Sequence, residues 1–247
     1  MALSTNTLIH FTKTKETLKA ILEENFRINL CFEQILLPVS NPEHVHSTAM
    51  YIPMVCFCDI PLSEIKDHMS KYGNYGLGMT KEWGLRNRLN PVLYLEKNSL
   101  LTKSFILSQV RLTQPSHEDE LGATKALLDI FRYVKNYEGY RGKPTPNYRF
   151  YDEREWRYVP PYTSDFPMLL YALRPDPDAK AAADAKLADI RLKFESEDIR
   201  YIIINDDTEI SEFVNHLNDV KGGKYSSKDI ERLTTRILTS DQIMTDM

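Results

Sequence analysis

The chain has 247 residues, 42% of them hydrophobic and 27% charged, a balance that excludes a disordered or low-complexity protein. Its formal net charge of -4 argues against a general binder of polyanions. No apolar stretch approaches the roughly 20 residues that cross a bilayer, no signal peptide pattern opens the chain, and three cysteines are too few for a disulfide framework, so we expect a cytoplasmic protein without a membrane partner.

Apolar periodicity predicts strands and helices that alternate irregularly along the chain. The predicted strands are short and lie at residues 8–12, 27–32, 52–60, 91–95, 148–159 and 199–204. The predicted helices lie at residues 14–25, 63–71, 98–133 with a break near Pro115, 178–189, 209–220 and 228–237. Few clean strand–helix–strand units occur in this order. It therefore predicts an α+β fold with a curved, mainly antiparallel sheet flanked by helices.

Segments rich in Gly, Pro and Asn separate these elements and predict loops at residues 36–50 and 135–147. A further short segment at 221–226 has the composition of a linker. We therefore predict a single α+β domain over residues 1–220. Residues 221–247 are predicted to form a C-terminal linker, a helix and a polar tail.

A possible zinc set consists of His44 and His46 together with Cys56 and Cys58. Zinc sites favour cysteine spacings of two to four residues, which Cys56 and Cys58 do not have. Both cysteines lie inside an apolar strand pattern, where cysteine is a common small core residue. We therefore expect no metal.

The first strand carries His10 and Thr12 immediately before a predicted helix. Residues two apart on a strand point to the same face, so these two side chains share one side of the sheet. A histidine at such a strand end can orient a ligand hydroxyl group. The alternative is a histidine that forms a hydrogen bond within the core.

The segment from Tyr72 to Gly78 alternates glycines with larger residues, including Tyr75. Glycines at this spacing let the backbone approach a flat ligand, and tyrosine offers a stacking face and a hydroxyl group. The spacing matches neither a dinucleotide fingerprint nor a P-loop. A turn that leads into a strand is the alternative.

The segment from Tyr148 to Tyr158 combines charges with aromatic residues. On a strand, Glu153 and Glu155 share a face, where two carboxylates repel each other unless a cation or a ligand lies between them. We therefore expect one of them to titrate at high pH, which suits acid–base chemistry or binding of a sugar hydroxyl. An exposed strand with cross-strand Glu–Arg pairs is the alternative, but the flanking aromatic residues favour the wall of a half-buried cleft.

Several short motifs together resemble the AbiGi family of abortive phage-resistance proteins over roughly residues 8–220. These motifs are Leu8-Ile9-His10-Phe11-Thr12, Phe57-Cys58-Asp59-Ile60-Pro61-Leu62-Ser63, His68, Tyr72-Gly73-x-Tyr75-Gly76-x-Gly78, Lys81, Trp83 and Glu153-x-Glu155-Trp156-Arg157. The resemblance implies a bacterial defence role, often described as that of an antitoxin.

A weaker similarity links the order of His10, the central tyrosines and Glu155 to the His-Tyr-Glu type of ADP-ribosyltransferase. It implies that Glu155 stabilises the oxocarbenium charge that develops when NAD loses nicotinamide, while Glu153 positions or deprotonates an acceptor. By the same similarity, NAD is the substrate, and His10, Thr12, Tyr72 and Tyr75 bind it. The segment Cys56-Phe57-Cys58 departs from the Ser-Thr-Ser-like element of many such transferases.

The resemblances lead to two hypotheses. The first is an anti-phage protein with an ADP-ribosyltransferase-like site that acts as a transferase or an NAD glycohydrolase, and it leaves open whether the acceptor is protein, nucleic acid or a small molecule. The second is a non-catalytic antitoxin or regulatory partner of a co-encoded toxin. In the second hypothesis, the weakly apolar helices at 178–189 and 228–237 are candidate docking elements.

Overall fold

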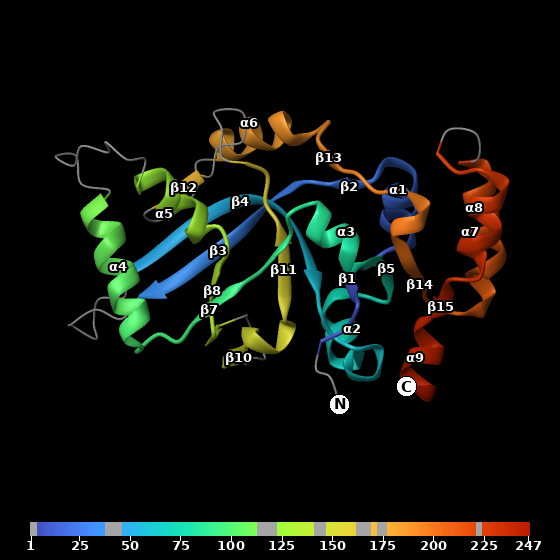
Figure 1. Cartoon of the computed structure of the whole chain (residues 1–247), viewed down its shortest axis with the longest axis horizontal. Helices are drawn as coiled ribbons and strands as arrows, with labels where there is room; N and C mark the ends of the chain where they lie inside the picture. Colours follow the sequence, from blue (N-terminus) through green and yellow to red (C-terminus); the bar gives the residue numbers. More distant parts are fainter. Residues whose placement is uncertain are drawn as a thin grey trace. The chain divides into compact units, whose positions relative to one another are not determined.

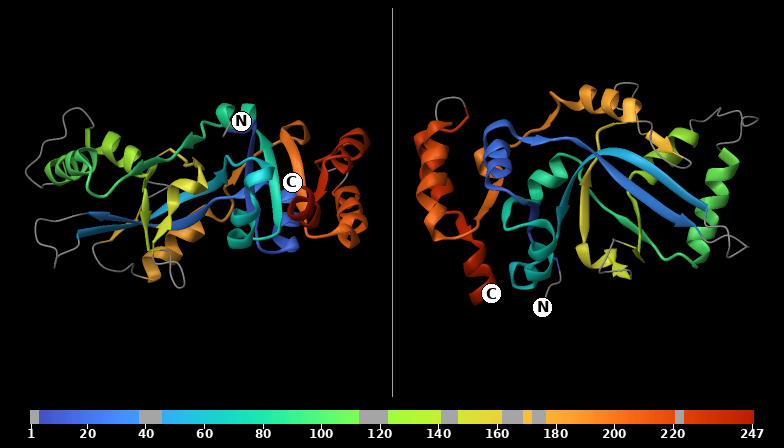
Figure 2. Two further views of the ribbon diagram at one scale, coloured as in Figure 1. Left: turned by 90° about the horizontal axis from the view of Figure 1, so that it is seen from below. Right: turned by 180° about the vertical axis from the view of Figure 1, so that it is seen from behind.

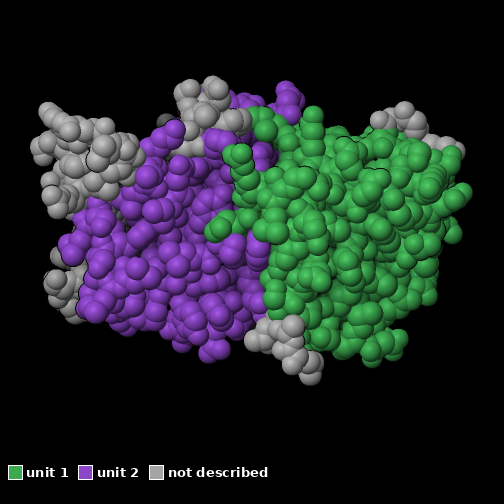
Figure 3. Space-filling model, viewed as in Figure 1, with its two compact units in different colours: residues 1–27, 55–90, 190–247 green, residues 28–54, 91–189 purple. Residues whose placement is uncertain are grey.

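The computed structural model describes residues 4–37, 46–112, 123–140, 147–161, 169–171, 177–220 and 224–247. It divides into two compact units, which Figure 3 shows in different colours. Unit 1 comprises residues 1–27, 55–90 and 190–247, and unit 2 comprises residues 28–54 and 91–189. Both units combine helices with mainly antiparallel strands, so the predicted mixed α+β class is confirmed.

Unit 1 is built on a sheet in which the strand order is β15-β14-β5-β1-β4. The strands are β1 (Thr7–Thr12), β4 (His46–Cys58, of which residues 55–58 belong to this unit), β5 (Tyr75–Thr80), β14 (Ile199–Ile204) and β15 (Ile237–Thr239). Strand β5 pairs antiparallel with both β1 and β14, whereas β14 and β15 are parallel. A two-residue pairing joins β2 (Phe26–Arg27) to β13 (Arg191–Leu192).

Helices surround this sheet, and each buries at least one apolar side chain. They are α1 (Lys15–Glu24), α2 (Lys66–Tyr72), α3 (Lys81–Arg86), α7 (Ile210–Asp219), α8 (Ser227–Thr234) and α9 (Ser240–Asp246). Helix α1 begins where Thr14 accepts a hydrogen bond from the Thr17 amide, and its buried face carries Leu18, Ile21 and Leu22. Helices α7 and α8 lie side by side in Figures 1 and 2.

Unit 2 contains a long antiparallel pair, β3 (Asn29–Leu37) with β4, whose register runs from Asn29 opposite Met54 to Leu37 opposite His46. Its other strands are β7 (Leu93–Leu95), β8 (Val134–Asn136), β9 (Glu138–Gly139), β10 (Tyr148–Arg149), β11 (Glu155–Tyr158) and β12 (Leu169–Tyr171), with β6 (Asn90–Pro91) at the boundary between the units. Its helices are α4 (Leu100–Leu112), α5 (Ala123–Phe131) and α6 (Pro177–Leu187). Strands β7 and β8 are parallel, and β12 pairs antiparallel with β4.

Several predicted elements differ from the structure, among them the loop predicted at 135–147, where β8 and β9 lie. The predicted strand over 148–159 is wrong, because a short 3-10 helix (Phe150–Glu153) and the left-handed residue Arg154 separate β10 from β11. The predicted loop at 36–50 is too long, since β3 and β4 occupy both of its ends. The break near Pro115 lies outside the described residues.

The predicted polar tail after α8 is also wrong, because residues 237–246 form β15 and α9. Ile202, Ile203 and Ile204 of β14 lie opposite the three residues of β15, which gives this end of the chain a place in the sheet. Helix α9 begins with a capping box between Thr239 and Gln242 and buries Ile243. The predicted division of the chain at residues 220 and 221 stays a prediction.

No helix among the described residues is both long and apolar enough to cross a membrane.

Candidate functional site

The Glu155 cluster is a buried group of three acidic and two basic side chains in unit 2. Its members are Glu33, Lys135, Glu153, Glu155 and Arg157. Glu153 is 3% exposed, Glu155 is 6% exposed and Arg157 is completely buried. Charges this far from water are tolerated only when they are paired, so the geometry of the pairing determines what the cluster can do.

Local backbone structure brings the two glutamates together. The 3-10 helix ends at Arg154, whose φ of 46° and ψ of 49° place it in the left-handed region, and β11 begins at the next residue. This tight turn lets Glu153 and Glu155 meet the same amine, although they do not lie on one continuous strand. The backbone amide of Glu155 donates to the Tyr94 hydroxyl at 2.9 Å, which fixes the start of β11 against β7.

Lys135 from β8 lies between the two glutamates. Its Nζ is 2.9 Å from Glu153 Oε2 and 2.7 Å from Glu155 Oε2. Burial disfavours the ammonium form, but the neighbouring carboxylates outweigh this effect and raise the pKa of Lys135 well above its ordinary value. Lys135 is therefore the cation that keeps the two carboxylates from repelling each other.

Arg157 supplies the second cation. Its Nε donates to Glu155 Oε1 at 2.6 Å, its Nη1 donates to the Arg132 carbonyl oxygen at 3.0 Å, and its Nη2 donates to Glu33 Oε1 at 2.5 Å. Both carboxylate oxygens of Glu155 thus bind a cation. Burial opposes ionisation of Glu155, but Arg157 and Lys135 more than compensate and lower its pKa well below the usual range.

The prediction that Glu153 or Glu155 titrates at high pH is wrong for Glu155, because its pKa is lowered. In this cluster, burial instead raises the pKa of Glu33 despite the attraction of Arg157 and Lys135. Three carboxylates share two cations, and Glu33 lies 4.0 Å from Lys135 Nζ, farther than the other two glutamates. Glu33 therefore holds its proton more tightly than Glu155 does.

In unit 1, the partly exposed ring of His10 packs against aromatic residues of the core. Its Nδ1 donates to the Cys56 carbonyl oxygen at 2.8 Å, and its ring centroid lies 5.4 Å from that of Phe26 and 5.7 Å from that of Phe57. Burial lowers the pKa of His10 despite this hydrogen bond, so the neutral imidazole is favoured. This environment matches the alternative of a histidine bonded within the core.

Thr12, Tyr72 and Tyr75 also lie in unit 1. Thr12 is opposite Tyr75 in the β1–β5 pairing, and the Tyr75 hydroxyl donates to Glu209 Oε1 at 2.9 Å. Burial and this hydrogen bond raise the pKa of Tyr75 to about 12. Tyr72 ends α2, where its ring centroid lies 4.4 Å from that of His68. Each tyrosine thus has a contact partner within the chain.

Two glycines of the Tyr72–Gly78 segment, Gly73 and Gly76, lie close to residues of β1. Gly73 has a φ of 122°, and a Cβ atom there would lie 2.2 Å from the Thr12 carbonyl oxygen. At Gly76 the space for a Cβ is limited by the ring of Phe11, at 3.1 Å. These positions need glycine for packing against β1 as well as for backbone conformation.

The structure therefore brings together one group of predicted site residues, Glu153 and Glu155, in unit 2. The other four, His10, Thr12, Tyr72 and Tyr75, belong to unit 1. Within the described parts of the chain, no group of three or more His, Cys, Asp or Glu side chains is arranged to hold a metal ion. His44, a member of the zinc set considered above, lies outside the described residues.

The Phe57–Ser63 and Lys81–Trp83 motifs form one structural feature of unit 1. Asp59 is 4% exposed, and its Oδ2 accepts hydrogen bonds from Lys81 Nζ at 2.7 Å and from Ser4 Oγ at 2.8 Å. The Trp83 ring lies 5.4 Å from that of Phe57, and its Nε1 donates to the Lys193 carbonyl oxygen at 3.0 Å. These signature residues hold the N-terminal segment, β4 and α3 together.

Sequence patterns did not indicate Glu33 or Lys135 as members of the Glu155 cluster. Glu33 is 124 residues from Arg157 along the chain, and Lys135 is 20 residues from Glu155. Neither residue stands in a motif of its own. The pairing of β7 with β8, which places Lys135 opposite Tyr94, helps to bring this amine to the cluster.

Fold and site together define an α+β protein in which the acidic pair Glu153 and Glu155 is neutralised inside one unit and the signature motifs build the core of the other. The chain belongs to the AbiGi family, because the family model described as "Putative abortive phage resistance protein AbiGi, antitoxin" matches residues 17–205. The resemblance identified from the motifs is thus confirmed.

A relative from Lactococcus lactis subsp. cremoris, named abortive phage resistance protein AbiGi, is 31% identical over 225 residues. The match covers 79% of this chain and 89% of that relative. No solved structure matches the chain significantly.

Proposed function

We propose that this protein acts in phage resistance as an antitoxin, a non-catalytic protein that binds and restrains a co-encoded toxin. The family description, which includes the word antitoxin, supports this role, and the name of the Lactococcus relative supports a part in phage resistance. The residues of the cluster give a physical reason to prefer binding over catalysis.

The observation that carries the proposal is the pairing of Glu155. A carboxylate that stabilises a developing positive charge must face that charge in the transition state. Both oxygens of Glu155 already face Arg157 and Lys135, at 2.6 and 2.7 Å. Removing one cation from such a buried pair leaves an uncompensated charge, at a cost of about 3–5 kcal/mol. This arrangement is typical of a structural ion-pair network.

Exposed leucines on α4 offer a contact surface for the toxin. Leu100, Leu101 and Leu107 are 80%, 53% and 69% exposed. Leu100 and Leu107 are seven residues apart and therefore lie on the same face of the helix. Exposed apolar residues grouped on one element are a common mark of a protein–protein contact. We therefore place the toxin contact on this face of α4.

The helices that the sequence suggested for docking are less suitable. In α6, Ala183 and Leu187 are buried, and in α8, Ile230 and Leu233 are buried. Their apolar side chains already pack within the fold, so they offer little surface to a partner.

Co-purification with the product of the neighbouring toxin gene tests this proposal. Leu107→Glu should abolish or strongly weaken recovery of the complex, because a charge at a desolvated contact lacks a partner. Leu85→Glu is the matched control: Leu85 is 62% exposed but lies on α3 of unit 1, and this variant should retain the complex. Equal recovery with both variants, each with a parental circular dichroism spectrum, would contradict a role for α4.

An ADP-ribosyltransferase-like activity on NAD is the second candidate. It is favoured by the convergence of Glu153 and Glu155 on the Lys135 amine, since such a carboxylate pair resembles the Glu-x-Glu element of some transferases. In this candidate function Glu155 stabilises the ribose cation and Glu153 positions or deprotonates the acceptor. Lys135 must then leave Glu155 when NAD binds.

Nicotinamide release from NAD tests the second candidate directly. If it is correct, the parent protein releases nicotinamide and Glu155→Gln does not. Absence of release by the parent, alone and together with the toxin, would eliminate this candidate and leave the antitoxin proposal intact.

A further inference from the structure

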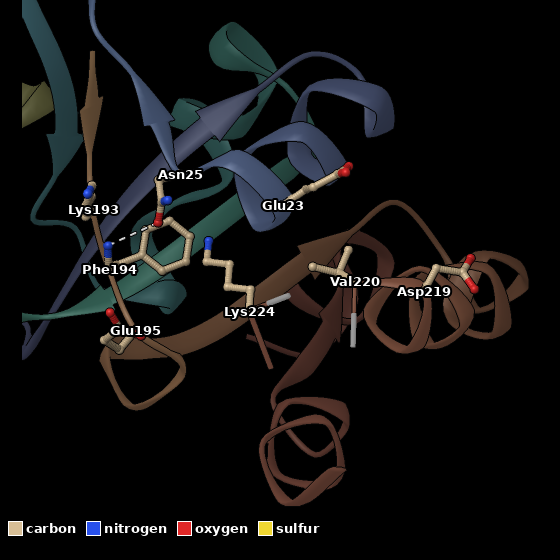
Figure 4. Close-up of a pocket in the computed structure, with 8 residues that line it drawn as sticks. All are labelled: Glu23, Asn25, Lys193, Phe194, Glu195, Asp219, Val220 and Lys224. Carbon is tan, nitrogen blue, oxygen red and sulfur yellow. Dashed lines mark hydrogen bonds between the residues drawn. The ribbon is translucent and has the colours of Figure 1, made fainter. Parts of the chain in front are cut away.

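A pocket of about 630 Å³ lies in unit 1, and none of its lining residues belongs to the Glu155 cluster. Its size falls within the range of small-molecule sites, roughly 300–1,000 Å³. The end of α1, the segment after β13 and the end of α7 form its walls. The lining residues are Glu23, Asn25, Lys193, Phe194, Glu195, Asp219, Val220 and Lys224. Figure 4 shows this pocket with all eight side chains.

The amine of Lys224 has an unusual set of contacts in this pocket. Its Nζ lies 3.9 Å from the centroid of the Phe194 ring and donates to the Leu22 carbonyl oxygen at 2.9 Å. The Tyr225 ring is a second aromatic neighbour, with its centroid 5.4 Å away. Lys224 thus rests on aromatic surface with one carbonyl partner, and Figure 4 shows its amine beside the Phe194 ring.

The pocket supplies little negative charge to this amine. Among the described residues no carboxylate forms a salt bridge with Lys224, and in Figure 4 the carboxylates of Glu23 and Asp219 point away from it. Glu195 acts on it only through longer-range attraction. Burial therefore dominates and lowers the pKa of Lys224 to about 8.

The surrounding residues hold the amine in place. Phe194 is 3% exposed, its backbone amide donates to Asn25 Oδ1 at 3.2 Å, and its ring packs 5.2 Å from that of Phe26. Tyr225 is 2% exposed and donates to the same Leu22 carbonyl at 2.7 Å. The aromatic support of Lys224 is therefore part of the buried core of unit 1.

We propose that Lys224 is a nucleophilic amine that binds a small aldehyde or ketone in this pocket by forming an imine. This site is separate from the antitoxin role and from the Glu155 cluster, so its test does not depend on either. Desolvated lysines beside apolar surface are the ones that form Schiff bases with carbonyl compounds.

The chemistry uses only the amine and the carbonyl ligand. The neutral Nζ donates one hydrogen to the Leu22 carbonyl oxygen and keeps its lone pair for the carbonyl carbon. Attack forms the C–N bond and a carbinolamine. The two amine hydrogens and the former carbonyl oxygen then leave as water, and the C=N double bond remains. No oxidant, reductant or metal takes part.

Reductive alkylation with acetaldehyde and cyanoborohydride tests the proposal, because the hydride traps each imine as a stable N-ethyl group. At pH 8, an amine with a pKa of about 8 is about half neutral, whereas an ordinary lysine is about 0.4% neutral. Peptide mapping of the intact full-length protein should therefore show Lys224 modified at least about tenfold faster than Lys193 of the same pocket.

The pH profile provides a second readout. The initial rate at Lys224 should level off above about pH 8, where its amine is mostly neutral. Lys224→Arg should lose the fast-reacting site and leave the rates at other lysines unchanged. Equal rates at Lys224 and Lys193 at pH 8, or a Lys224 rate that rises without a plateau, would overturn the proposal.

Discussion

Removing the Lys135 amine is the perturbation that most directly probes the Glu155 cluster. Lys135→Met keeps most of the apolar stem of the side chain but deletes the cation that lies 2.7 Å from Glu155 and 2.9 Å from Glu153. The two carboxylate side chains are only 7% and 4% exposed, so water cannot replace the lost partner. Breaking a buried ion pair in this way costs about 3–5 kcal/mol.

This cost is a large share of the stability of an ordinary domain, roughly 5–15 kcal/mol. Urea unfolding followed by circular dichroism should therefore show a much lower midpoint for Lys135→Met at pH 7. Lys180→Met is the matched control, because Lys180 pairs with Asp184 on the surface of α6 in the same unit. Exposed helix pairs contribute little, so the control should unfold close to the parent.

The stability difference between the parent and Lys135→Met should depend on pH. The folded-state pKa of Glu155 is lowered, so its contribution to stability is fully present above its ordinary value near 4.5 and is lost as the pH falls through the folded value. Without Lys135 this lowering is weaker, and acid removes less stability from the variant. The gap between parent and variant should stay constant from pH 7 to about pH 5 and narrow as the pH falls below about 4.5. If Lys135→Met and Lys180→Met lose equal stability, or the gap is independent of pH, the argument for a buried ion-pair network is refuted.

Two further predictions concern unit 1. Gly73→Ala should lower the free energy of unfolding by about 1–3 kcal/mol, because the new Cβ would lie 2.2 Å from the Thr12 carbonyl oxygen in a backbone conformation with φ of 122°. Gly139→Ala is the control, because the nearest atom to its new Cβ is 3.4 Å away. In the same urea titration, this variant should change the free energy of unfolding little. Ser226→Ala should cost about 1 kcal/mol by removing the cap of α8, and a parental midpoint would show that the cap contributes nothing. Hydrogen bonds from Ser226 lower the pKa of Asp229 to about 2, so in Ser226→Ala the pKa of Asp229, measured by NMR titration, should move toward 3.8. In the parent, the stability that this hydrogen-bonded pair contributes should be lost as the pH falls from about 4 to 2.

Elements with strong local patterns could be predicted from the sequence. The helix expected at 14–25 is α1 at Lys15–Glu24, and the strand expected at 199–204 is β14 at Ile199–Ile204. Both carry apolar residues at the period of their element, and Thr14 supplies a cap. The α+β class follows from the order of such elements, and the family follows from the signature motifs that pack around Asp59 and Trp83.

The Glu155 cluster could be predicted only in part. The sequence places Glu153, Glu155 and Arg157 close together, but it suggests a continuous strand and a glutamate with raised pKa. The turn at Arg154 and the amine of Lys135 determine the actual arrangement. The position of Lys135 depends on the parallel pairing of β7 with β8, which no local pattern shows. Long-range pairing therefore decides whether the two glutamates are neutralised.

We propose that this chain restrains a toxin by binding it. Isothermal titration of the purified chain with the product of the neighbouring toxin gene tests that claim most directly. We predict a saturable complex with the parent and with Leu85→Glu, and an affinity at least about tenfold lower with Leu107→Glu, which corresponds to about 1.4 kcal/mol. A parent protein that gives no binding heat with the toxin but releases nicotinamide from NAD would contradict the claim.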